Sequence, residues 1–250
     1  MRNIKLLIEY DGSAYVGWQR QVQPNSIQQV LEEAIERITG QHSRVTGAGR
    51  TDAGVHAAGQ VASFHTDSAL PAERLREALN AVLPSDIAIL AVEEAPQDFH
   101  AQFGATSKRY EYTISTRPAR PVFGRERCWH CTWPLDIAQM RRAAELLVGT
   151  HDFAGFASSG SERKTTVRTV TRCELREETD RVILVIEGDG FLYNMVRTIA
   201  GTLVDVARGK LPLERVAEVL ASGDRERAGR TAPPGGLCLV RVDYGEKQRS

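Results

Sequence analysis

The chain has 250 residues, of which 42% are hydrophobic and 26% are charged. This composition is typical of a globular protein with a buried core and excludes wholesale disorder. Because 32 basic and 32 acidic residues leave a formal net charge of zero, binding of nucleic acid would depend on local basic patches. The N-terminus, MRNIKLLIEYDG, reads as a strand rather than a signal peptide, and no apolar run is long enough to span a membrane. With four scattered cysteines, a cytoplasmic protein is expected.

The first half of the chain begins with a predicted strand at 3–10. A loop follows, and Ser26 with Gln29 then predicts a capping box for a helix that Gly40 ends. The apolar face of this helix is expected to contain Ile27, Val30, Leu31, Ala34, Ile35 and Ile38. The remaining expected elements are a short strand near 43–46, a loop, a strand at 59–66, a helix from Pro71 to Val82, and strands at 86–94 and 105–116.

The second half repeats this layout loosely. Asp136 is expected to cap a helix that presents Ile137, Met140, Ala144, Leu147 and Val148 and ends at Gly149. Strands at 166–177 and 181–187, helices at 190–208 and 212–221, and a final strand at 237–244 follow. Strands in hairpin-like pairs and helices in separate groups predict an α+β architecture.

Two domains are expected, 1–105 and 106–250. The segment RPARPVFGRER, residues 117–127, is the best candidate for a crossover or linker. Its proline, glycine and arginine content suits neither a helix nor a central strand.

The stretch GAGRTDAGVHAAGQVASFH, residues 47–65, places Asp52 among glycines and alanines, with Arg50 two residues before it. It is neither a dinucleotide fingerprint nor a P-loop, because its third glycine is mis-spaced, no lysine follows, and VHAAGQVASF alternates like a strand. An arginine close to a buried aspartate favours the ionised carboxylate, which can serve as a nucleophile or base. For these two residues alone, a structural ion pair is the more ordinary interpretation.

Two further segments combine basic and aromatic or apolar residues. Tyr110 lies in SKRYEYTI, where Lys108 and Arg109 precede it in a predicted strand. This interleaving suits stacking on RNA bases beside phosphates, although strand tyrosines mostly pack in cores. Arg197 lies on an otherwise apolar helix, where a guanidinium either reaches water or needs an anionic partner.

Cys128 and Cys131 form a CxxC pair in RERCWHCTWP. A redox pair of the thioredoxin type would open a helix, but this segment alternates and then meets Pro134. A zinc site would need a second close pair, whereas Cys173 and Cys238 are isolated. We interpret these residues as ordinary strand cysteines and expect no metal site.

Six blocks of the chain together resemble the tRNA pseudouridine synthase A (TruA) family. In order, they are YDGSAYVGWQRQ, GAGRTDAGVHAAGQVASF, ATSKRYEYTI, HDFAGF, GDGFLYNMVRTIAGTLVDV and AGRTAPPGGLCLVRV. They extend from Tyr10 to Val242, and the GRTDxGVHA core is highly specific. The resemblance implies two α+β domains with mostly antiparallel mixed sheets joined across a central catalytic cleft.

The resemblance also implies a tRNA-modifying enzyme, a cytoplasmic homodimer that binds tRNA across both subunits and needs no cofactor. It would convert uridine to pseudouridine at positions 38, 39 and 40 of the anticodon stem-loop. The target base must be flipped out of its stack. Basic segments at 117–127, 163–172 and 225–230 are expected to meet phosphates.

The family motifs assign expected roles to four residues. Asp52 would be the catalytic residue, and it could attack the ribose, attack the base or remove a ribose proton. Tyr110 would contact the target base, Arg50 would help displace the uridine, and Arg197 would partner the carboxylate. The alternative function is a non-catalytic RNA-binding or tRNA chaperone module on the same fold, and a nucleotide-dependent enzyme is a third.

Overall fold

The computed structural model describes residues 1–22, 25–158 and 165–245, which form two compact units. The first unit contains Met1–Thr106 together with the described residues from Cys238 onward, and the second contains Ser107–Leu237. The chain therefore passes from one unit to the other close to the expected boundary, but its last strand does not stay with 106–250. The reason is that β10 (Leu237–Tyr244) pairs in parallel with β3 (His56–Thr66), with Cys238 opposite His56.

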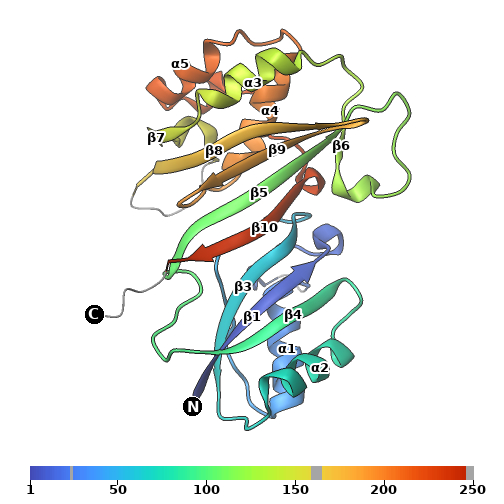
Figure 1. The fold of residues 1–250 in the computed structure, drawn as a ribbon, viewed down its shortest axis with the longest axis vertical. Coiled ribbons are helices and arrows are strands. Elements are labelled where there is room, and N and C mark those ends of the chain that lie inside the picture. The colour runs from blue at the N-terminus through green and yellow to red at the C-terminus, as the bar shows by residue number, and fades with distance from the viewer. Residues whose placement is uncertain (23–24, 159–164, 246–250) are drawn as a thin grey trace. The chain divides into compact units, whose positions relative to one another are not determined.

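The first unit is built on strands in the order β4 (Ile87–Ala95), β1 (Arg2–Tyr10), β3 and β10. β1 lies antiparallel to both of its neighbours, and the two-residue strand β2 (Thr46–Gly47) pairs antiparallel with β3. Helices α1 (Ile27–Thr39) and α2 (Ala72–Val82) accompany this sheet (Figure 1). Alternating residues of β1 (Ile4, Leu6 and Ile8) are fully buried, as the period of a strand requires.

Helix α1 begins and ends as the sequence predicts, but its buried face differs. The Gln29 backbone N–H donates to Ser26 Oγ at 3.3 Å, and Gly40 ends the helix with a φ of 70°. The Gln29 side chain donates to Glu33 at 2.8 Å, so the return bond of a capping box is replaced. Gln28 and Glu32 are buried on this helix, whereas the expected core residues Val30 and Ile38 are only half-buried.

The second unit is built on strands in the order β5 (Ala105–Ser115), β9 (Arg181–Gly188), β8 (Val167–Glu178) and β7 (Gly149–Asp152), all antiparallel. The short β6 (Trp129–His130) pairs in parallel with β5. Helices α3 (Ile137–Glu145), α4 (Met195–Ala207) and α5 (Arg215–Ser222) lie together beside β7–β9 (Figure 1). The predicted α+β class with mostly antiparallel strands is thus confirmed.

Segment 117–127 lies within the second unit, between β5 and β6. Because these two strands pair with each other, the segment is a loop that returns the chain to the same strand. It does not connect the two units.

Five predicted boundaries are wrong by three residues or more, and one of them is the start of α5, which lies at Arg215 instead of 212. α4 begins at Met195 instead of 190, because Asn194 takes the left-handed conformation with a φ of 61°. α3 ends at Glu145, and Gly149, with a φ of 123°, opens β7 instead of ending the helix. β3 begins three residues earlier than expected, at His56, and β2 lies at Thr46–Gly47 rather than 43–46. Among the described residues, no helix has both the length and the apolar character of a membrane span.

Candidate active site

The loop that carries Asp52 is fixed to β3 at both of its ends. Before the loop, Gly47 of β2 pairs with Ala62 of β3, and the Ala48 N–H donates to the Val61 carbonyl at 2.7 Å. After it, the Val55 N–H donates to the carbonyl of Asp52 at 3.1 Å, closing a turn that contains Gly54 with a φ of 76°. The strand expected after the motif is present as β3, and it holds the loop at both ends.

A second segment, residues 12–18, is held against the Asp52 loop by hydrogen bonds between backbone groups. The Trp18 N–H donates to the Thr51 carbonyl at 3.0 Å, and the Gly54 N–H donates to the Tyr15 carbonyl at 3.4 Å. Gly17 has a φ of 106°, and a Cβ atom there would lie 2.7 Å from the Thr51 carbonyl oxygen. Only glycine allows this approach, so the position of Asp52 depends on main-chain packing between two loops.

Glycine is also required where β2 meets Trp18. A Cβ atom on Gly47 would lie 2.4 Å from the Trp18 indole, which is almost fully buried. The indole therefore fills the space beside the strand that leads into the Asp52 loop. The sequence blocks contain both residues, but no periodicity in the sequence shows that they touch.

Two buried polar side chains, one on β1 and one on β3, form hydrogen bonds with the same loop. Tyr10 Oη lies 2.8 Å from Thr51 Oγ1, and Gln60 Nε2 donates to the Gly49 carbonyl at 2.9 Å. Burial raises the pKa of Tyr10 above its ordinary value of 10.0, so its phenol is neutral at physiological pH. These contacts add side-chain support to the backbone hydrogen bonds.

Asp52 and Arg50 do not form the structural ion pair considered from the sequence. Asp52 is half-buried and Arg50 is exposed, and Arg50 has no hydrogen bond or ion pair with any described residue. Its guanidinium therefore remains available to a partner outside the chain.

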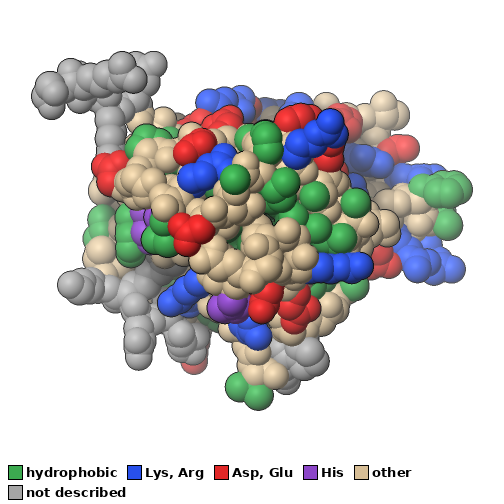
Figure 2. Space-filling model, turned by 90° about the horizontal axis from the view of Figure 1, so that it is seen from below, with side chains coloured by type: hydrophobic (Ala, Val, Ile, Leu, Met, Phe, Trp, Pro, Cys, Tyr) green, Lys and Arg blue, Asp and Glu red, His purple; other side chains and the backbone are tan. Residues whose placement is uncertain are grey.

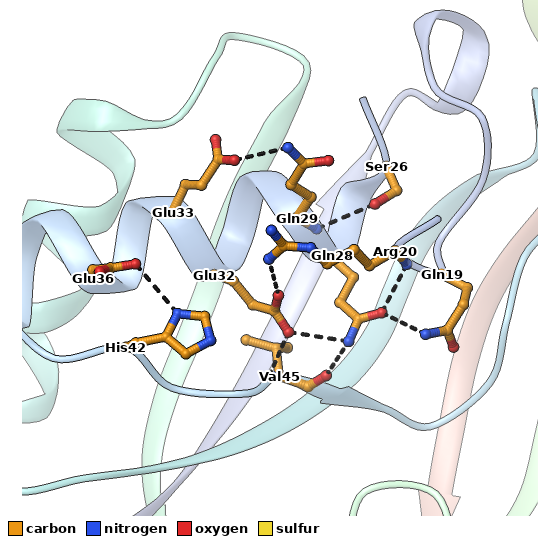
Figure 3. Close-up of polar contacts among 10 residues, drawn as sticks. All are labelled: Gln19, Arg20, Ser26, Gln28, Gln29, Glu32, Glu33, Glu36, His42 and Val45. Atoms are coloured by element: carbon orange, nitrogen blue, oxygen red, sulfur yellow. Dashed lines mark hydrogen bonds and ion pairs between the residues drawn. The ribbon is translucent and has the colours of Figure 1, made fainter. Parts of the chain in front are cut away.

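A buried polar network on α1 holds the segments on both sides of the loop (Figure 3). The Glu32 carboxylate is almost fully buried and accepts from Arg20 Nη1 at 2.9 Å and from the Val45 N–H at 3.1 Å. Gln28 donates to Glu32 at 3.1 Å and to the Val45 carbonyl at 3.0 Å. Arg20 follows residues 12–18, and Val45 precedes β2. Helix α1 therefore holds both of the segments that contact or lead into the Asp52 loop.

The sequence analysis missed this network. A signal for it was present in the sequence. Gln28 and Glu32 are four residues apart and each follows an apolar residue of the buried face, Ile27 and Leu31, so their side chains lie next to that face. A buried carboxylate is stabilised only when its oxygens are satisfied, and three donors satisfy this one.

His56 forms a second support at the start of β3. Its ring is buried, and Nδ1 accepts from the Gly12 N–H at 3.1 Å and lies 3.2 Å from Asp11 Oδ1. A Cβ atom on Gly12 would lie 2.0 Å from the Val55 carbonyl oxygen, so this loop packs directly against the end of the Asp52 turn.

The second unit contains Tyr110 and Arg197. Tyr110 lies on β5 opposite Ile186, is only 6% exposed, and meets Phe191 edge-on at a centroid distance of 5.3 Å. Its neighbour Arg109 pairs with Glu187 at 2.7 Å. Arg109 is therefore less available to a phosphate than the sequence pattern suggested, because it already has an acidic partner.

Arg197 lies in the first turn of α4, where polar groups orient its guanidinium. Nε donates to the Ala232 carbonyl at 2.9 Å, and Nη1 donates to Asn194 Oδ1 at 2.8 Å. Asn194 in turn donates to Ser158 Oγ at 3.0 Å. The left-handed backbone of Asn194, which ends the preceding loop, places its amide beside the arginine.

Residues 229–236, which we call the strap, run against α4. A Cβ atom on Gly201 would lie 1.8 Å from the Arg230 carbonyl oxygen, and the Gly229 N–H donates to Thr202 Oγ1 at 2.9 Å. The Ala232 N–H donates to the Arg197 carbonyl at 3.0 Å. The strap thus fixes the carbonyl that holds the Arg197 side chain.

In two of the three basic segments, arginines have partners within the chain. In 225–230, Arg225 donates to Gly229 and Thr231, and Arg230 approaches buried Asp205 at 3.4 Å, so these arginines serve the fold. In 163–172, Arg172 pairs with Glu174, and residues 163 and 164 lie outside the described residues. On the face drawn in Figure 2, basic side chains are interspersed with acidic ones, as the zero net charge suggests.

Asp205 is a further residue that sequence reasoning missed. It is buried on α4 with Arg208 at 3.6 Å and Lys210 at 3.7 Å, and the Arg208 guanidinium stacks on Trp133 at 3.6 Å. An aspartate inside the apolar run GTLVDVA was the available signal. Its position among basic groups indicates a structural anchor for the end of the helix.

Cys128 and Cys131 flank the two residues of β6 and are not disulfide-bonded. Burial raises the pKa of both thiols, which makes them less reactive at neutral pH. Among the described residues, no group of three or more His, Cys, Asp or Glu side chains could hold a metal ion.

Comparison with known proteins identifies the family of this chain. A family model described as tRNA pseudouridine synthase matches residues 6–104 and 143–245, ranges that include Arg50, Asp52 and Arg197 but not Tyr110. A weaker structural likeness, with a TM-score of 0.38 and 13% identity over 97% of this chain and 50% of the other, is to a chain in a crystal structure of a Cbf5-Nop10-Gar1 complex, and it carries no inference.

Relatives named tRNA pseudouridine synthase A match over almost the whole chain. The protein from Acetivibrio thermocellus is 49% identical over 98% of this chain and 100% of its own length. The proteins from Citrifermentans bemidjiense and Thermoanaerobacter sp. (strain X514) are 48% and 46% identical, over 99% and 98% of this chain and 99% and 100% of their own lengths. This chain therefore belongs to the tRNA pseudouridine synthase family.

Proposed function

We propose that this chain isomerises uridine to pseudouridine in tRNA, at positions 38, 39 and 40 of the anticodon stem-loop. Membership of the family and the names of the relatives support the reaction. The observation that carries the proposal is the Asp52 loop, in which close backbone contacts orient one carboxylate among small residues. Small side chains leave room for a nucleotide that has been turned out of its stack.

The proposed reaction rearranges bonds within one nucleotide. The N1–C1′ bond breaks, the uracil rotates, and a C5–C1′ bond forms, while C5 loses a proton and N1 gains one. Atoms and electrons balance without a redox carrier or a phosphoryl donor. The carboxylate of Asp52 acts directly on the ribose or the base, and the hydrogen bonds around its loop preorganise it for that step.

Three other residues receive roles on the substrate. Arg50 is exposed, so we assign it to the RNA around the displaced uridine. Tyr110 contacts the target base with the small part of its ring that burial and Phe191 leave accessible. Arg197, oriented by Ala232 and Asn194, supplies positive charge on the substrate side.

The substitution Asp52→Asn tests the reaction. It keeps the shape of the side chain and removes its negative charge, so pseudouridine formation should fall by about 10⁴-fold or more. Release of tritium from tRNA labelled at uridine C5 measures turnover. The exposed Asp67, which pairs with the N-terminus, provides the matched control Asp67→Asn, which should retain activity.

Normal turnover by Asp52→Asn would remove this residue from the chemistry. A wild-type protein that binds tRNA but forms no pseudouridine would instead support the alternative, a non-catalytic RNA-binding or tRNA chaperone module. Mapping of pseudouridine in tRNA after incubation with the purified protein tests the three proposed positions.

The acting form is proposed to be a cytoplasmic homodimer that binds tRNA across both subunits. The support is the resemblance of the motif blocks, which extend from Tyr10 to Val242. Light scattering at assay concentrations should give the mass of two chains. A monomeric mass at full activity would contradict the homodimer and leave the proposed reaction in place.

A further inference from the structure

The loop 117–127 has an apolar tip surrounded by arginines. Phe123 is 94% exposed and Val122 is 65% exposed, although large apolar side chains usually contribute to a core. Arg117, Arg120, Arg125 and Arg127 lie in the same loop, with Glu126 as its one acidic residue. This loop falls between the two ranges matched by the family model, so the match assigns nothing to it.

Three arginines of the loop, Arg117, Arg120 and Arg125, are available to a partner. Arg120 is exposed and has no hydrogen bond or ion pair with any described residue. Arg117 lies 3.9 Å from Asp180, and Arg125 lies 2.7 Å from Glu126, with all four side chains largely exposed. Exposed ion pairs contribute little to stability, so phosphates can replace these carboxylates at small cost.

The base of the loop is well anchored, which makes its tip preorganised. Pro121 is buried, and the Arg127 N–H donates to the Gly124 carbonyl at 3.0 Å, closing a turn at Gly124 with a φ of 67°. Pro118 and Pro121 further restrict the backbone. Binding through Phe123 would therefore cost little conformational entropy.

The loop also adjoins the part of the second unit that holds Arg197. A Cβ atom on Gly235 would lie 2.5 Å from the Glu126 carbonyl oxygen, so the loop packs directly on the strap. Within the strap, the Ala232 carbonyl accepts from Arg197 and the Pro233 carbonyl accepts from Tyr112. The apolar tip and the Arg197 side chain are thus connected through one short segment.

We propose that the loop 117–127 is an RNA-binding arm, in which Phe123 stacks on an unpaired base and the arginines contact the flanking phosphates. The inference rests on the proposed function, because tRNA supplies the partner. An aromatic face with adjacent guanidinium groups is what single-stranded RNA recognition requires. A second copy of the chain fits less well, because a two-fold contact centred on this loop would place four arginines against their own copies.

Binding of unmodified tRNA at several salt concentrations tests the arm with Phe123→Ala and Arg120→Ala. Loss of one stacked base should weaken binding by roughly 5- to 100-fold for Phe123→Ala, with an unchanged salt slope. Arg120→Ala should lower the slope of log K against log[salt] by about 0.7 to 0.9. Phe103→Ala is the matched control, because Phe103 is also an exposed phenylalanine, in the first unit, and it should bind like wild type.

If Phe123→Ala bound tRNA with wild-type affinity, the proposed RNA-binding arm would be wrong. It would also be wrong if a loss of affinity accompanied a fall in oligomer mass by light scattering, because the tip would then be a contact between copies. Thermal melting verifies that the variants fold. Pseudouridine formation by the wild type is scored separately, so failure of the proposed function would show there while tRNA binding still decides the arm.

Discussion

The Asp52 loop and the Arg197 region are held in position in different ways. In the first unit, one loop packs against another. Residues 12–18 form backbone hydrogen bonds with Thr51 and Gly54, and Gly17 allows the two loops to approach closely. In the second unit, the strap meets a helix, and Gly201 allows that approach. Both regions depend on glycine, but the close approach joins two loops in the first unit and joins the strap to a helix in the second.

This difference predicts how each region fails. A loop can shift by a few tenths of an ångström while the sheet beneath it remains intact, so changes in the first region should affect activity more than stability. A helix packed against the strap cannot shift without disturbing the core, because α4 is buried along most of its length. Changes there should affect stability first.

Among changes to the residues that support the two regions, the largest effect is expected from Gly17→Ala. The new Cβ atom would lie 2.7 Å from the Thr51 carbonyl oxygen at a φ of 106°, so the segment beside Asp52 must move. Because a misplacement of about 1 Å can cost about 100-fold in rate, kcat should fall by up to about that factor in the tritium-release assay. Far-ultraviolet circular dichroism should remain that of the wild type.

Gly40→Ala is the matched control for this substitution. Gly40 also has a positive φ, of 70°, but a Cβ atom there would meet nothing within 4 Å. It should lose roughly 1 kcal/mol of stability from backbone strain and retain its activity. Equal losses of activity in the two variants would show that positive φ, and not the contact with Thr51, explains the effect.

A large loss of stability is expected from Gly201→Ala. In a free helix this change stabilises by about 1 kcal/mol, but here the Cβ atom would lie 1.8 Å from the Arg230 carbonyl oxygen. Overpacking should lower the free energy of unfolding by about 1–3 kcal/mol, measured in urea. A gain in stability would mean that the strap is loosely packed, and the contrast between the two regions would fail.

Sequence patterns predicted most elements because their signals are local. The alternation in β1, the Ser26 cap and the Gly40 stop all act within a few residues, and the structure contains each of them. The parallel pairing of β10 with β3 could not be predicted in this way, since Cys238 and His56 are brought together only by the complete fold.

The candidate site was predictable as a motif but not as an arrangement. The Gly-rich block marked Asp52, yet the close approaches of Gly17 and Gly47 involve residues that are far apart in the sequence. Glu32 was hidden because a charged residue on a helix is normally exposed. Arg50 was first paired with Asp52 because only their spacing was visible.

A loss of stability of similar size is expected from Glu32→Gln. A glutamine has one acceptor oxygen and places an NH₂ group where Arg20 or Val45 now donates. An unsatisfied buried donor costs about 1–3 kcal/mol, so the free energy of unfolding should fall by an amount in that range. If the network orients the Asp52 loop, kcat should also fall, because Arg20 and Val45 flank the segments that support it.

Glu33→Gln is the control on the same helix. Glu33 is exposed and contacts only the Gln29 side chain at 2.8 Å among the described residues. It should leave both stability and kcat close to wild type. A fall in stability for Glu32→Gln with an unchanged kcat would assign the network to the fold alone.

The smallest effect is expected from Tyr10 at alkaline pH. Burial raises the pKa of Tyr10 above its ordinary value of 10.0, so the folded chain keeps the phenol protonated at a pH where the unfolded chain ionises. The stabilising contribution is therefore complete below pH 10 and is lost as the pH rises through and above it.

Urea unfolding between about pH 8 and 11 should show a shallower fall in stability for Tyr10→Phe. The exposed Tyr193 gives the control Tyr193→Phe. An unchanged slope in Tyr10→Phe would mean that the Tyr10 phenol is accessible to solvent, and Gln60 would then be the buried side chain that supports the Asp52 loop.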